Sequence, residues 1–306
     1  MKILIISSNL IGDTILSTGI IENFSKIYPK AKFTFITGPS SGQIYKNFPS
    51  KEKIILIKKK KYNIHWINMY LSSCFTKWDI VIDFRSSLIS YFLRTNKKFI
   101  FKKQKNVNHL EQLKKSFKFS NFELFIHTNY EEDVEAHNNL DESFKHVVIF
   151  PGGNWKPKIW PANYYNELIS SLNNKFSKIK FVIVGSSQEK RIYLNLIKNN
   201  LPDEIFIDLM GSSLTTTSAY MKKSNLFIGN DSGLMHLSVA SNLKTIGLFG
   251  PTNDKIYGHK NKNSFIIRTK QDYSYFKKNN INQNNSYMHS IKTSDILDLI
   301  TIKKLL

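Results

Sequence analysis

The sequence predicts an α/β protein with two doubly wound parallel-sheet domains. Apolar runs of strand length alternate with amphipathic helical stretches along most of the chain. The strand runs are continuously apolar, as in parallel sheets that helices cover on both faces. The 306 residues are enough for two hydrophobic cores. Two Rossmann-like domains are therefore expected, each with its functional loops at the carboxyl ends of the strands.

The first half of the chain, residues 1–130, is expected to form the N-terminal domain, because apolar runs between turn residues predict five strands there. These strands are Lys2–Ser7, Lys32–Ile36, Lys53–Ile57, Asp79–Phe84 and Lys97–Phe101. The helices expected between them are Thr14–Tyr28, Ser41–Asn47, Ile64–Thr76 and Ser86–Leu93.

The second half, residues 146–306, repeats this alternation with clearer boundaries. Its expected strands are His146–Phe150, Lys180–Val184, Glu204–Asp208, Leu226–Ile228 and Lys244–Phe249. Its expected helices are Ala162–Phe176, Gln188–Asn199, Thr215–Lys223 and Gly233–Ser241. The acidic stretch 131–145 is expected to be the linker and residues 270–290 a loop. A final helix, Thr293–Leu305, closes the chain, and packing back towards the N-terminal domain is one option for it.

The net charge of +21 is unevenly distributed. Residues 1–126 have a net charge of +15, residues 127–145 of −5 and residues 146–306 of +11. Within 51–118 there are 17 basic and 4 acidic residues, including the run Lys58–Lys61. A basic field of this kind attracts nucleic acid, anionic lipid headgroups or acidic glycans. The alternative is that these lysines only solvate surface loops.

Cysteine and hydropathy patterns indicate a cytoplasmic protein. Cys74 is the single cysteine, so neither an intramolecular disulfide nor a cysteine-based zinc site is expected, and a reducing compartment is favoured. The apolar N-terminal run ends at Ser7 and is too short for a signal peptide. No apolar stretch approaches the roughly 18 residues of a membrane span.

The first candidate loop follows the first strand and contains Gly12 and Asp13. It lacks the G-x-G-x-x-G fingerprint and the Gly-Lys-Ser/Thr of a P-loop, which argues against NAD-dependent redox chemistry and P-loop nucleotide hydrolysis. Asp13 has two interpretations. It is either the N-cap of the next helix or a general base that takes a proton from an attacking hydroxyl group.

The second candidate loop, Phe150–Pro161, follows the first strand of the second half. Gly152 and Gly153 allow backbone amides to approach a phosphate, and the lysines of the loop add positive charge. The alternative is a solvent-exposed loop with Trp160 packed as a hydrophobic staple; Trp160 itself is expected in the core.

The third candidate loop, Ile228–Leu237, again leads from a strand into a helix. Ser232 and Gly233 are placed to present amides to a diphosphate at the positive end of the helix dipole. Asp231 is alternatively an N-cap, and His236 is alternatively a buried core histidine. The turn Gly250-Pro251-Thr252 is expected at the same edge of the sheet.

Together these loops resemble the family-9 glycosyltransferases, whose best-known members are the ADP-heptose:lipopolysaccharide heptosyltransferases. The blocks that carry the resemblance are Gly12–Thr18, Pro151-Gly152 with Lys158–Pro161, Gly229–His236 and Leu248–Thr252. The family often has proline where this chain has Gly19, a detail of helix geometry expected to matter little. Beyond its first turn, the N-terminal half offers no further segment that matches.

The resemblance implies a GT-B fold, in which the N-terminal half binds the acceptor, the C-terminal half binds the nucleotide-sugar, and reaction occurs in the cleft between them. It implies that Asp13 is the general base and that Lys158 contacts the donor phosphates. Asn154 lies near a polar phosphate contact, and Glu189 matches a carboxylate that holds the nucleotide ribose. The implied diphosphate-binding block contains Asp231, Ser232, Gly233 and His236, with Gly153 in the preceding glycine loop.

The expected function is transfer, with inversion, of a heptose or related sugar from an ADP-activated donor to an anionic lipopolysaccharide-core-type acceptor. No cofactor is expected, and no metal is expected to be required, because the chain contains no Asp-x-Asp motif. The basic surface then draws the enzyme to an anionic membrane, where it is peripheral. The alternatives are the same fold with another nucleotide-sugar and surface glycan, a noncatalytic relative, and a basic nucleic-acid-binding protein, for which no signature motif occurs.

Overall fold

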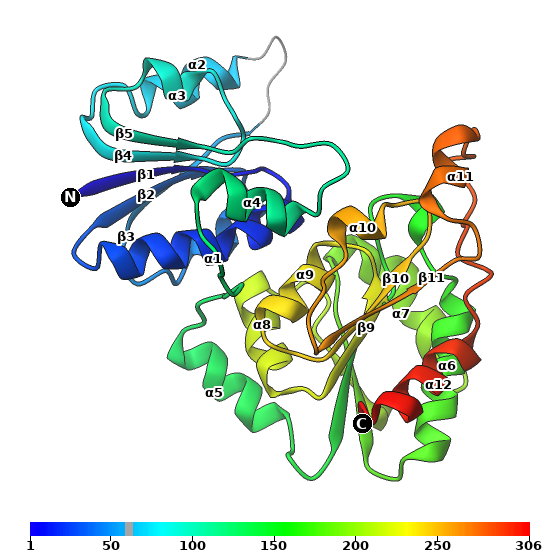
Figure 1. Ribbon diagram of the computed structural model, residues 1–306. Coiled ribbons are helices and arrows are strands. Elements are labelled where there is room, and N and C mark those ends of the chain that lie inside the picture. The colour runs from blue at the N-terminus through cyan, green and yellow to red at the C-terminus, as the bar shows by residue number, and fades with distance from the viewer. Residues whose placement is uncertain (59–63) are drawn as a thin grey trace. The chain divides into compact units, whose positions relative to one another are not determined.

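The computed structural model describes residues 1–58 and 64–306 and divides into two compact units, Met1–Asn129 and Tyr130–Leu306 (Figure 1). Each unit contains one parallel sheet with helices on both faces, so the predicted fold class is confirmed. Of the basic run Lys58–Lys61, the last three lysines lie outside the described residues. No helix among the described residues is long and apolar enough to cross a membrane.

The sheet of the first unit has the strand order β3-β2-β1-β4-β5, and all its strand pairs are parallel. The strands are β1 (Lys2–Ile6), β2 (Lys32–Thr37), β3 (Lys51–Leu56), β4 (Trp78–Asp83) and β5 (Thr95–Ile100). The chain reverses its direction of winding between β1 and β4. Such a switch point is where open α/β sheets bind ligands, at the carboxyl ends of the strands.

Helices cover both faces of this sheet (Figure 1). They are α1 (Ile11–Ile27), α2 (His65–Leu71), α3 (Ile89–Phe92) and α4 (His109–Phe117), with the 3₁₀ helix η1 (Ser41–Tyr45). On one face, Met69 of α2 and Ile89 of α3 pack into a core with Leu4 and Val81 of the sheet. Helices α1 and α4 pack on each other on the opposite face. Helix α4 was not predicted. Its apolar residues Leu110, Leu113 and Phe117 do recur at helical spacing, but the helix is short and lies among lysines.

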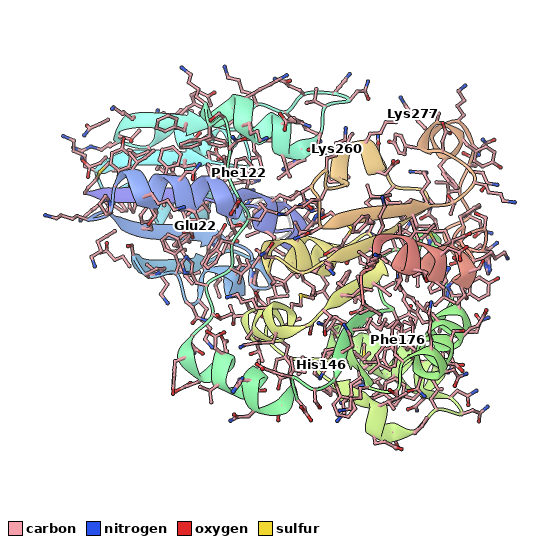
Figure 2. All side chains as sticks on the ribbon, turned by 60° about the horizontal axis from the view of Figure 1, so that its bottom comes forward. Glu22, Phe122, His146, Phe176, Lys260 and Lys277 are labelled. Atoms are coloured by element: carbon pink, nitrogen blue, oxygen red, sulfur yellow. The ribbon has the colours of Figure 1, made fainter. Side chains whose placement is uncertain are left out.

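Gly19 has a packing role that the sequence comparison with the family did not suggest. The segment after α4 runs along α1, where Figure 2 labels Glu22 and Phe122. A Cβ atom at Gly19 would lie 2.4 Å from both the Glu123 carbonyl oxygen and a ring carbon of Phe122. The expectation that this position matters little was therefore wrong, since glycine is what lets the segment cross the helix so closely.

The sheet of the second unit has the order β11-β10-β9-β6-β7-β8, again entirely parallel. Its strands are β6 (Lys145–Phe150), β7 (Ile179–Ile183), β8 (Phe206–Asp208), β9 (Leu226–Asn230), β10 (Thr245–Phe249) and β11 (Ser264–Arg268). Numbered from its own first strand, this is the dinucleotide-fold order 3-2-1-4-5-6. The switch point lies between β6 and β9. Strand β11 was not predicted.

Helices α6 (Ala162–Lys175), α7 (Ser187–Lys198) and α12 (Thr293–Lys303) share one apolar core with the sheet. Trp160, Tyr165 and Leu168 are fully buried in it. The final helix packs on α6, within its own unit. Helices α8 (Leu214–Lys223) and α9 (Gly233–Ala240) pack together, and short helices α10 (Asp254–Tyr257) and α11 (Tyr273–Lys278) lie in the following segments. Residues 270–290, expected as loop, thus contain α11.

The segment expected to be an acidic linker is largely helical. Helix α5 (Tyr130–Asn139) packs on α8, and the Thr215 hydroxyl donates to the buried Glu132 carboxylate at 2.6 Å. The Asn139 side chain donates to the Tyr220 hydroxyl at 2.6 Å. These polar contacts with α8 stabilise α5. The sequence of α5 did not predict a helix, because it is acidic and its apolar residues are weakly patterned.

Candidate active site

In the first unit, Asp13 lies in the first turn of α1, directly after the carboxyl end of β1. The interpretation of Asp13 as an N-cap is wrong. The N-cap of α1 is Leu10, and Asp13 lies within the first turn of the helix. Its carboxylate is partly buried and lies 3.5 Å from the Ser8 hydroxyl. A carboxylate in this place is favoured by the helix dipole and is not tied up in capping.

Hydrogen bonds from several hydroxyl side chains hold the loop that leads from β1 to Asp13. The Ser8 carbonyl oxygen accepts three hydrogen bonds of 3.0 Å, from Thr14, Thr37 and Ser41. The Ser7 hydroxyl lies 2.7 Å from that of Tyr45, whose burial raises its pKa to about 12. These contacts from β2 and η1 fix the path of the chain immediately before Asp13.

His109, the first residue of α4, is a neighbour of Asp13 that the sequence did not reveal. Burial lowers the pKa of His109, and the charge of Asp13 acts in the opposite direction. The positive charge of Lys103 lowers the pKa further. The two side chains are far apart in sequence and are brought together by the packing of α4 on α1, so no local motif could have identified the pair.

In the second unit, Asn230 at the end of β9 connects the two loops of the switch point. Its Oδ1 accepts from the Trp160 amide at 3.0 Å and from the Tyr165 hydroxyl at 3.2 Å. Its Nδ2 donates to the Gly152 carbonyl at 2.8 Å and to the Pro151 carbonyl at 3.3 Å. The side chain is fully buried. Asn230 thus positions the glycine loop, a role that sequence analysis did not assign to it.

Glu189 braces the same glycine loop from the other side. One carboxylate oxygen accepts from the Gly153 amide at 2.7 Å. The other accepts from the Ser186 amide at 2.7 Å and its hydroxyl at 2.8 Å, which completes a capping box at the start of α7. A Cβ atom at Gly152 would lie 2.2 Å from the Glu189 carboxylate, so this close approach requires glycine.

Lys158 and Asp231 are two charged residues at the carboxyl edge of the second unit's sheet. Lys158 ends the 3₁₀ helix η3 (Lys156–Lys158) and is partly buried, whereas Asn154 in the same loop is exposed. Asp231 is only 5% exposed; burial raises the pKa of its carboxyl, and the charge of Lys158 partly offsets this. The interpretation of Asp231 as an N-cap is wrong, because Ser232 is the cap of α9 and accepts from the Met235 amide at 3.4 Å.

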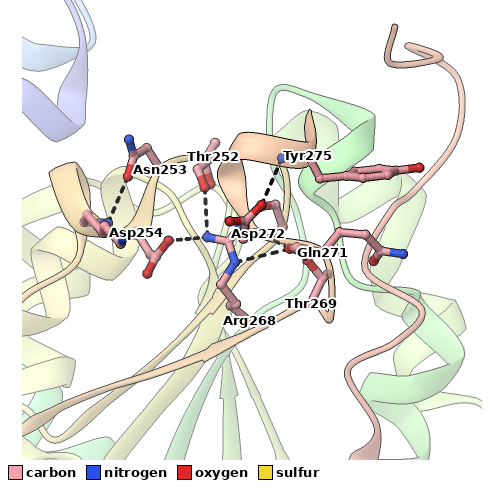
Figure 3. Close-up of polar contacts among 10 residues, drawn as sticks. Thr252, Asn253, Asp254, Arg268, Thr269, Gln271, Asp272 and Tyr275 are labelled. Carbon is pink, nitrogen blue, oxygen red and sulfur yellow. Dashed lines mark hydrogen bonds and ion pairs between the residues drawn. The ribbon is translucent and has the colours of Figure 1, made fainter. Parts of the chain in front are cut away.

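Arg268, at the end of β11, organises the neighbouring turn (Figure 3). Its guanidinium group donates to the Gly250 carbonyl at 2.6 Å and to the Thr252 carbonyl at 3.3 Å, and it pairs with Asp254. The nearby Thr252 hydroxyl lowers the pKa of Asp231. This hydroxyl is buried against the Asp231 carboxyl. Arg268 was missed because β11 was not predicted.

His236 lies in α9, four residues after its Ser232 cap, and is buried. Its Nδ1 lies 2.7 Å from Nε2 of His259, which is also buried and follows α10. The alternative of a satisfied, buried histidine therefore fits the environment of His236. His259 itself was not singled out by the sequence, because nothing local distinguishes it from a surface histidine.

The predicted residues therefore separate into one group in each unit. In the second unit, Gly153 with Glu189 and Lys158 with Asp231 are neighbours at the carboxyl ends of β6, β7 and β9. Backbone amides, a lysine and a helix N-terminus at a switch point are suited to bind a diphosphate. In the first unit, a carboxylate occupies the corresponding edge and is suited to accept a proton.

Comparison with known proteins identifies the family. Residues 123–286 match the family model described as glycosyltransferase family 9 (heptosyltransferase). The chain is 26% identical over 266 residues to lipooligosaccharide heptosyltransferase 2 of Campylobacter jejuni, covering 82% of each protein. It is 24% identical to lipopolysaccharide heptosyltransferase 1 of Campylobacter coli in an alignment of 345 positions that covers 98% of each protein.

Solved structures share the fold. A family-9 glycosyltransferase of Veillonella parvula matches with a TM-score of 0.78 and 19% identity, over 99% of this chain and 97% of that one. The ADP-heptose lipopolysaccharide heptosyltransferase II of E. coli matches with a TM-score of 0.76 and 18% identity, over 100% and 99%. Both sheets thus belong to a GT-B glycosyltransferase fold. Because the family model matches more than half of the sequence, the chain belongs to glycosyltransferase family 9, the heptosyltransferase family.

Proposed function

We propose that this protein transfers a heptose, or a closely related sugar, from an ADP-activated donor to an anionic acceptor of the lipopolysaccharide-core type. The observation that carries the proposal is the braced glycine loop beside Lys158 at the switch point of the second unit. Heptosyltransferases are the relatives of this chain, and one solved structure with the same fold is a heptosyltransferase with ADP. Both facts support an ADP-linked heptose as the donor.

The proposed donor site uses the residues gathered in the second unit. Lys158 and the amides of Ser232 and Gly233 stabilise the charge on the diphosphate, and preorganised groups of this kind often contribute most to catalysis. His236 and Asn154 contribute further polar contacts. Gly153 gives the loop its shape, because its own amide is bonded to Glu189.

Asp231 and Glu189 are acidic residues placed beside an anionic ligand. Asp231 stands next to Lys158 and orients that lysine towards the diphosphate. Glu189 accepts three of the roughly four hydrogen bonds that a carboxylate can accept. A ribose hydroxyl group can take the remaining position.

The proposed reaction is a single displacement with inversion. Asp13 takes the proton of an acceptor hydroxyl group, and the acceptor oxygen forms a bond to the anomeric carbon of the sugar. The bond between that carbon and the diphosphate oxygen breaks, and its electron pair leaves with the nucleoside diphosphate. Neither a cofactor nor a metal ion takes part in this scheme.

The proposed setting is the cytoplasmic side of a membrane. Residues 1–126 have a net charge of +15, which favours an acidic glycolipid acceptor and an anionic membrane surface over a neutral substrate. Nucleic acid is not part of this proposal.

Replacement of Asp13 tests the mechanism. The Asp13→Ala variant is expected to lose about 10²–10⁴-fold in turnover while it binds ADP nearly as well as the unchanged protein. The Lys158→Ala variant is expected to weaken ADP binding as well as turnover. Near-normal turnover of Asp13→Ala would show that the general base lies elsewhere.

A panel of ligands tests the substrate class. At about 100 times its dissociation constant, a ligand is expected to stabilise the protein by about 2.7 kcal/mol. A thermal shift with ADP alone supports the proposal, whereas a shift with UDP or GDP points to another nucleotide-sugar. A shift with a DNA oligomer alone contradicts it. NMR of the product tests inversion, and turnover in EDTA tests metal independence.

A further inference from the structure

An unusual concentration of exposed apolar side chains lies on and next to helices α2 and α3 of the first unit. Among the described residues, 20 large hydrophobic side chains are exposed, and 8 of them fall between residues 64 and 92. Phe75 is 85% exposed, Leu88 76% and Phe92 71%. Single exposed apolar residues are common on soluble proteins, but such a cluster indicates an interaction surface.

Helix geometry places these side chains on one surface. In α2, His65 and Met69 point into the core, while Ile67 and Leu71 are four residues apart and lie together on the outer side. The two helices pack beside each other on the same face of the sheet (Figure 1).

Helix α3 follows the same division between inner and outer sides. Ile89 and Ser90 are buried, whereas Leu88, Tyr91 and Phe92 are exposed. We call the exposed apolar side chains on and next to these two helices the α2–α3 face, and it consists of Ile67, Leu71, Phe75, Leu88, Tyr91 and Phe92.

The charges around the α2–α3 face are positive. Lys77 and Arg94 are exposed beside it. The Lys98 ammonium group lies 5.7 Å from the centre of the Tyr91 ring and donates to the Tyr91 carbonyl at 3.0 Å.

Residues 64–98 contain two acidic residues, and only Asp79 leaves a partly exposed carboxylate at the surface, so the charge around the face stays positive. Asp83 is buried and accepts from the amides of Arg85 and Ser87, both at 2.7 Å. Asp79 accepts from the Lys2 amide at 2.7 Å. Apolar and aromatic side chains rimmed by lysine and arginine match a membrane interface, where rings enter the acyl region and cations meet lipid phosphates.

We infer that the α2–α3 face docks on a bilayer that contains anionic phospholipid. This inference deepens the proposed function, since it names the surface through which the enzyme would reach a lipid-linked acceptor. The apolar side chains insert, and the surrounding cations make the binding depend on lipid charge and on salt. A second copy of the chain would use the apolar side chains but would gain nothing from the cationic rim.

Sedimentation of the full-length protein with vesicles tests the inference. Phosphatidylcholine vesicles with phosphatidylglycerol are expected to bind the protein, and vesicles of phosphatidylcholine alone are expected to bind much less. The triple variant Phe75→Ser, Leu88→Ser and Phe92→Ser is expected to reduce the partition coefficient by at least about tenfold. The variant Arg94→Glu with Lys98→Glu is expected to bind less and to lose most of the salt dependence.

The matched control is Ile192→Ser with Ile302→Ser, which removes two exposed apolar side chains from the second unit. This control is expected to bind vesicles like the unchanged protein. The inference is overturned if the unchanged protein does not bind vesicles that contain phosphatidylglycerol, or if the triple variant binds them equally well. Conversion of a dimer to a monomer by the triple variant, without a change in vesicle binding, identifies the face as a protein interface instead.

Turnover of a short water-soluble acceptor separates this inference from the proposed function. The triple variant is expected to keep its kcat/KM on such an acceptor and its circular dichroism spectrum. Loss of vesicle binding with normal turnover supports the docking face. If the unchanged protein binds vesicles but shows no sugar transfer, the docking face stands and the proposed function is wrong.

Discussion

The imidazole rings of His236 and His259 are joined by a hydrogen bond of 2.7 Å between Nδ1 of the first and Nε2 of the second. Both rings are buried, and they come from α9 and from the segment after α10. Because Nδ1 of His236 is engaged, a contact between His236 and the donor diphosphate would use Nε2. In the proposed donor site, His259 would therefore set the orientation and the tautomer of His236.

Replacement of His259 by phenylalanine is expected to lower kcat/KM for the donor by about tenfold, because a lost buried hydrogen bond is worth about 1–3 kcal/mol. The Gln variant keeps a donor and an acceptor and is expected to recover part of this loss. Nitrogen NMR of the His236 ring should report a changed tautomer population in the Phe variant. The exposed His137 provides the control: His137→Phe should leave both measurements unchanged. An unaltered His236 spectrum in His259→Phe would argue against the positioning role.

The same histidine predicts a pH dependence of stability. Burial lowers the pKa of His259 from 6.5 to about 4, so the unfolded chain binds a proton there at a higher pH than the folded protein does. Stability is therefore expected to fall as the pH decreases from about 6.5 to about 4, by about 3 kcal/mol in all. Denaturant unfolding of the unchanged protein and of His259→Phe at several pH values measures this contribution as a difference.

Comparing the unchanged protein with His259→Phe also cancels the contributions that other titratable groups make to the pH dependence of stability. Burial raises the pKa of Asp83 and of Asp231, and these carboxyl groups change stability in the opposite direction as the pH falls. Equal pH dependence of the two proteins would mean that His259 titrates normally in the folded state.

Asn230→Asp is expected to destabilise the second unit and to disrupt the glycine loop that contains Gly152 and Gly153. The substitution replaces the donating Nδ2 by an oxygen that faces the carbonyl groups of Pro151 and Gly152. Loss of these bonds and the burial of an unpaired acceptor predict a decrease of about 3 kcal/mol in the free energy of unfolding. ADP affinity should fall at the same time. The exposed Asn195→Asp on α7 is the control, and a similar small effect in both variants would refute the central role of Asn230.

Glu189→Ala distinguishes a brace from a ribose ligand. Because Glu189 holds the Gly153 amide and the start of α7, its loss should loosen the glycine loop and reduce stability by about 1 kcal/mol. Calorimetry is then expected to show similar fractional losses of affinity for ADP and for inorganic pyrophosphate. A loss confined to ADP would instead assign Glu189 to the ribose alone.

Gly19→Ala is expected to destabilise the first unit, although alanine is the better helix former by about 1 kcal/mol. The added methyl group would lie 2.4 Å from the Glu123 carbonyl oxygen, and overpacking of this kind destabilises by about 1–3 kcal/mol. Thermal unfolding should therefore show a lower midpoint. Lys26→Ala, at an exposed position of the same helix, should leave the midpoint nearly unchanged. A higher midpoint for Gly19→Ala would show that the crossing segment moves away freely.

The N-cap interpretations of Asp13 and Asp231 show what local sequence rules cannot predict. Aspartate is a favoured cap, yet α1 begins after Leu10 and α9 is capped by Ser232, so Asp13 and Asp231 are left for other roles. Several residues can serve as caps in each of these loops, and the direction in which the chain leaves the strand decides among them.

Local signals were enough to predict the alternation of strands and helices, the two parallel sheets and the three loops at strand ends, because continuous apolar runs and glycine-rich turns are visible in short stretches of sequence. Helices α4 and α5 and strand β11 were decided by tertiary packing, since their own sequences are short, charged or weakly patterned. The pairs Gly153 with Glu189 and His236 with His259 also required the tertiary structure. Their members lie 36 and 23 residues apart, and only the folding of separate segments to the same edge of a parallel sheet brings such residues within hydrogen-bond distance.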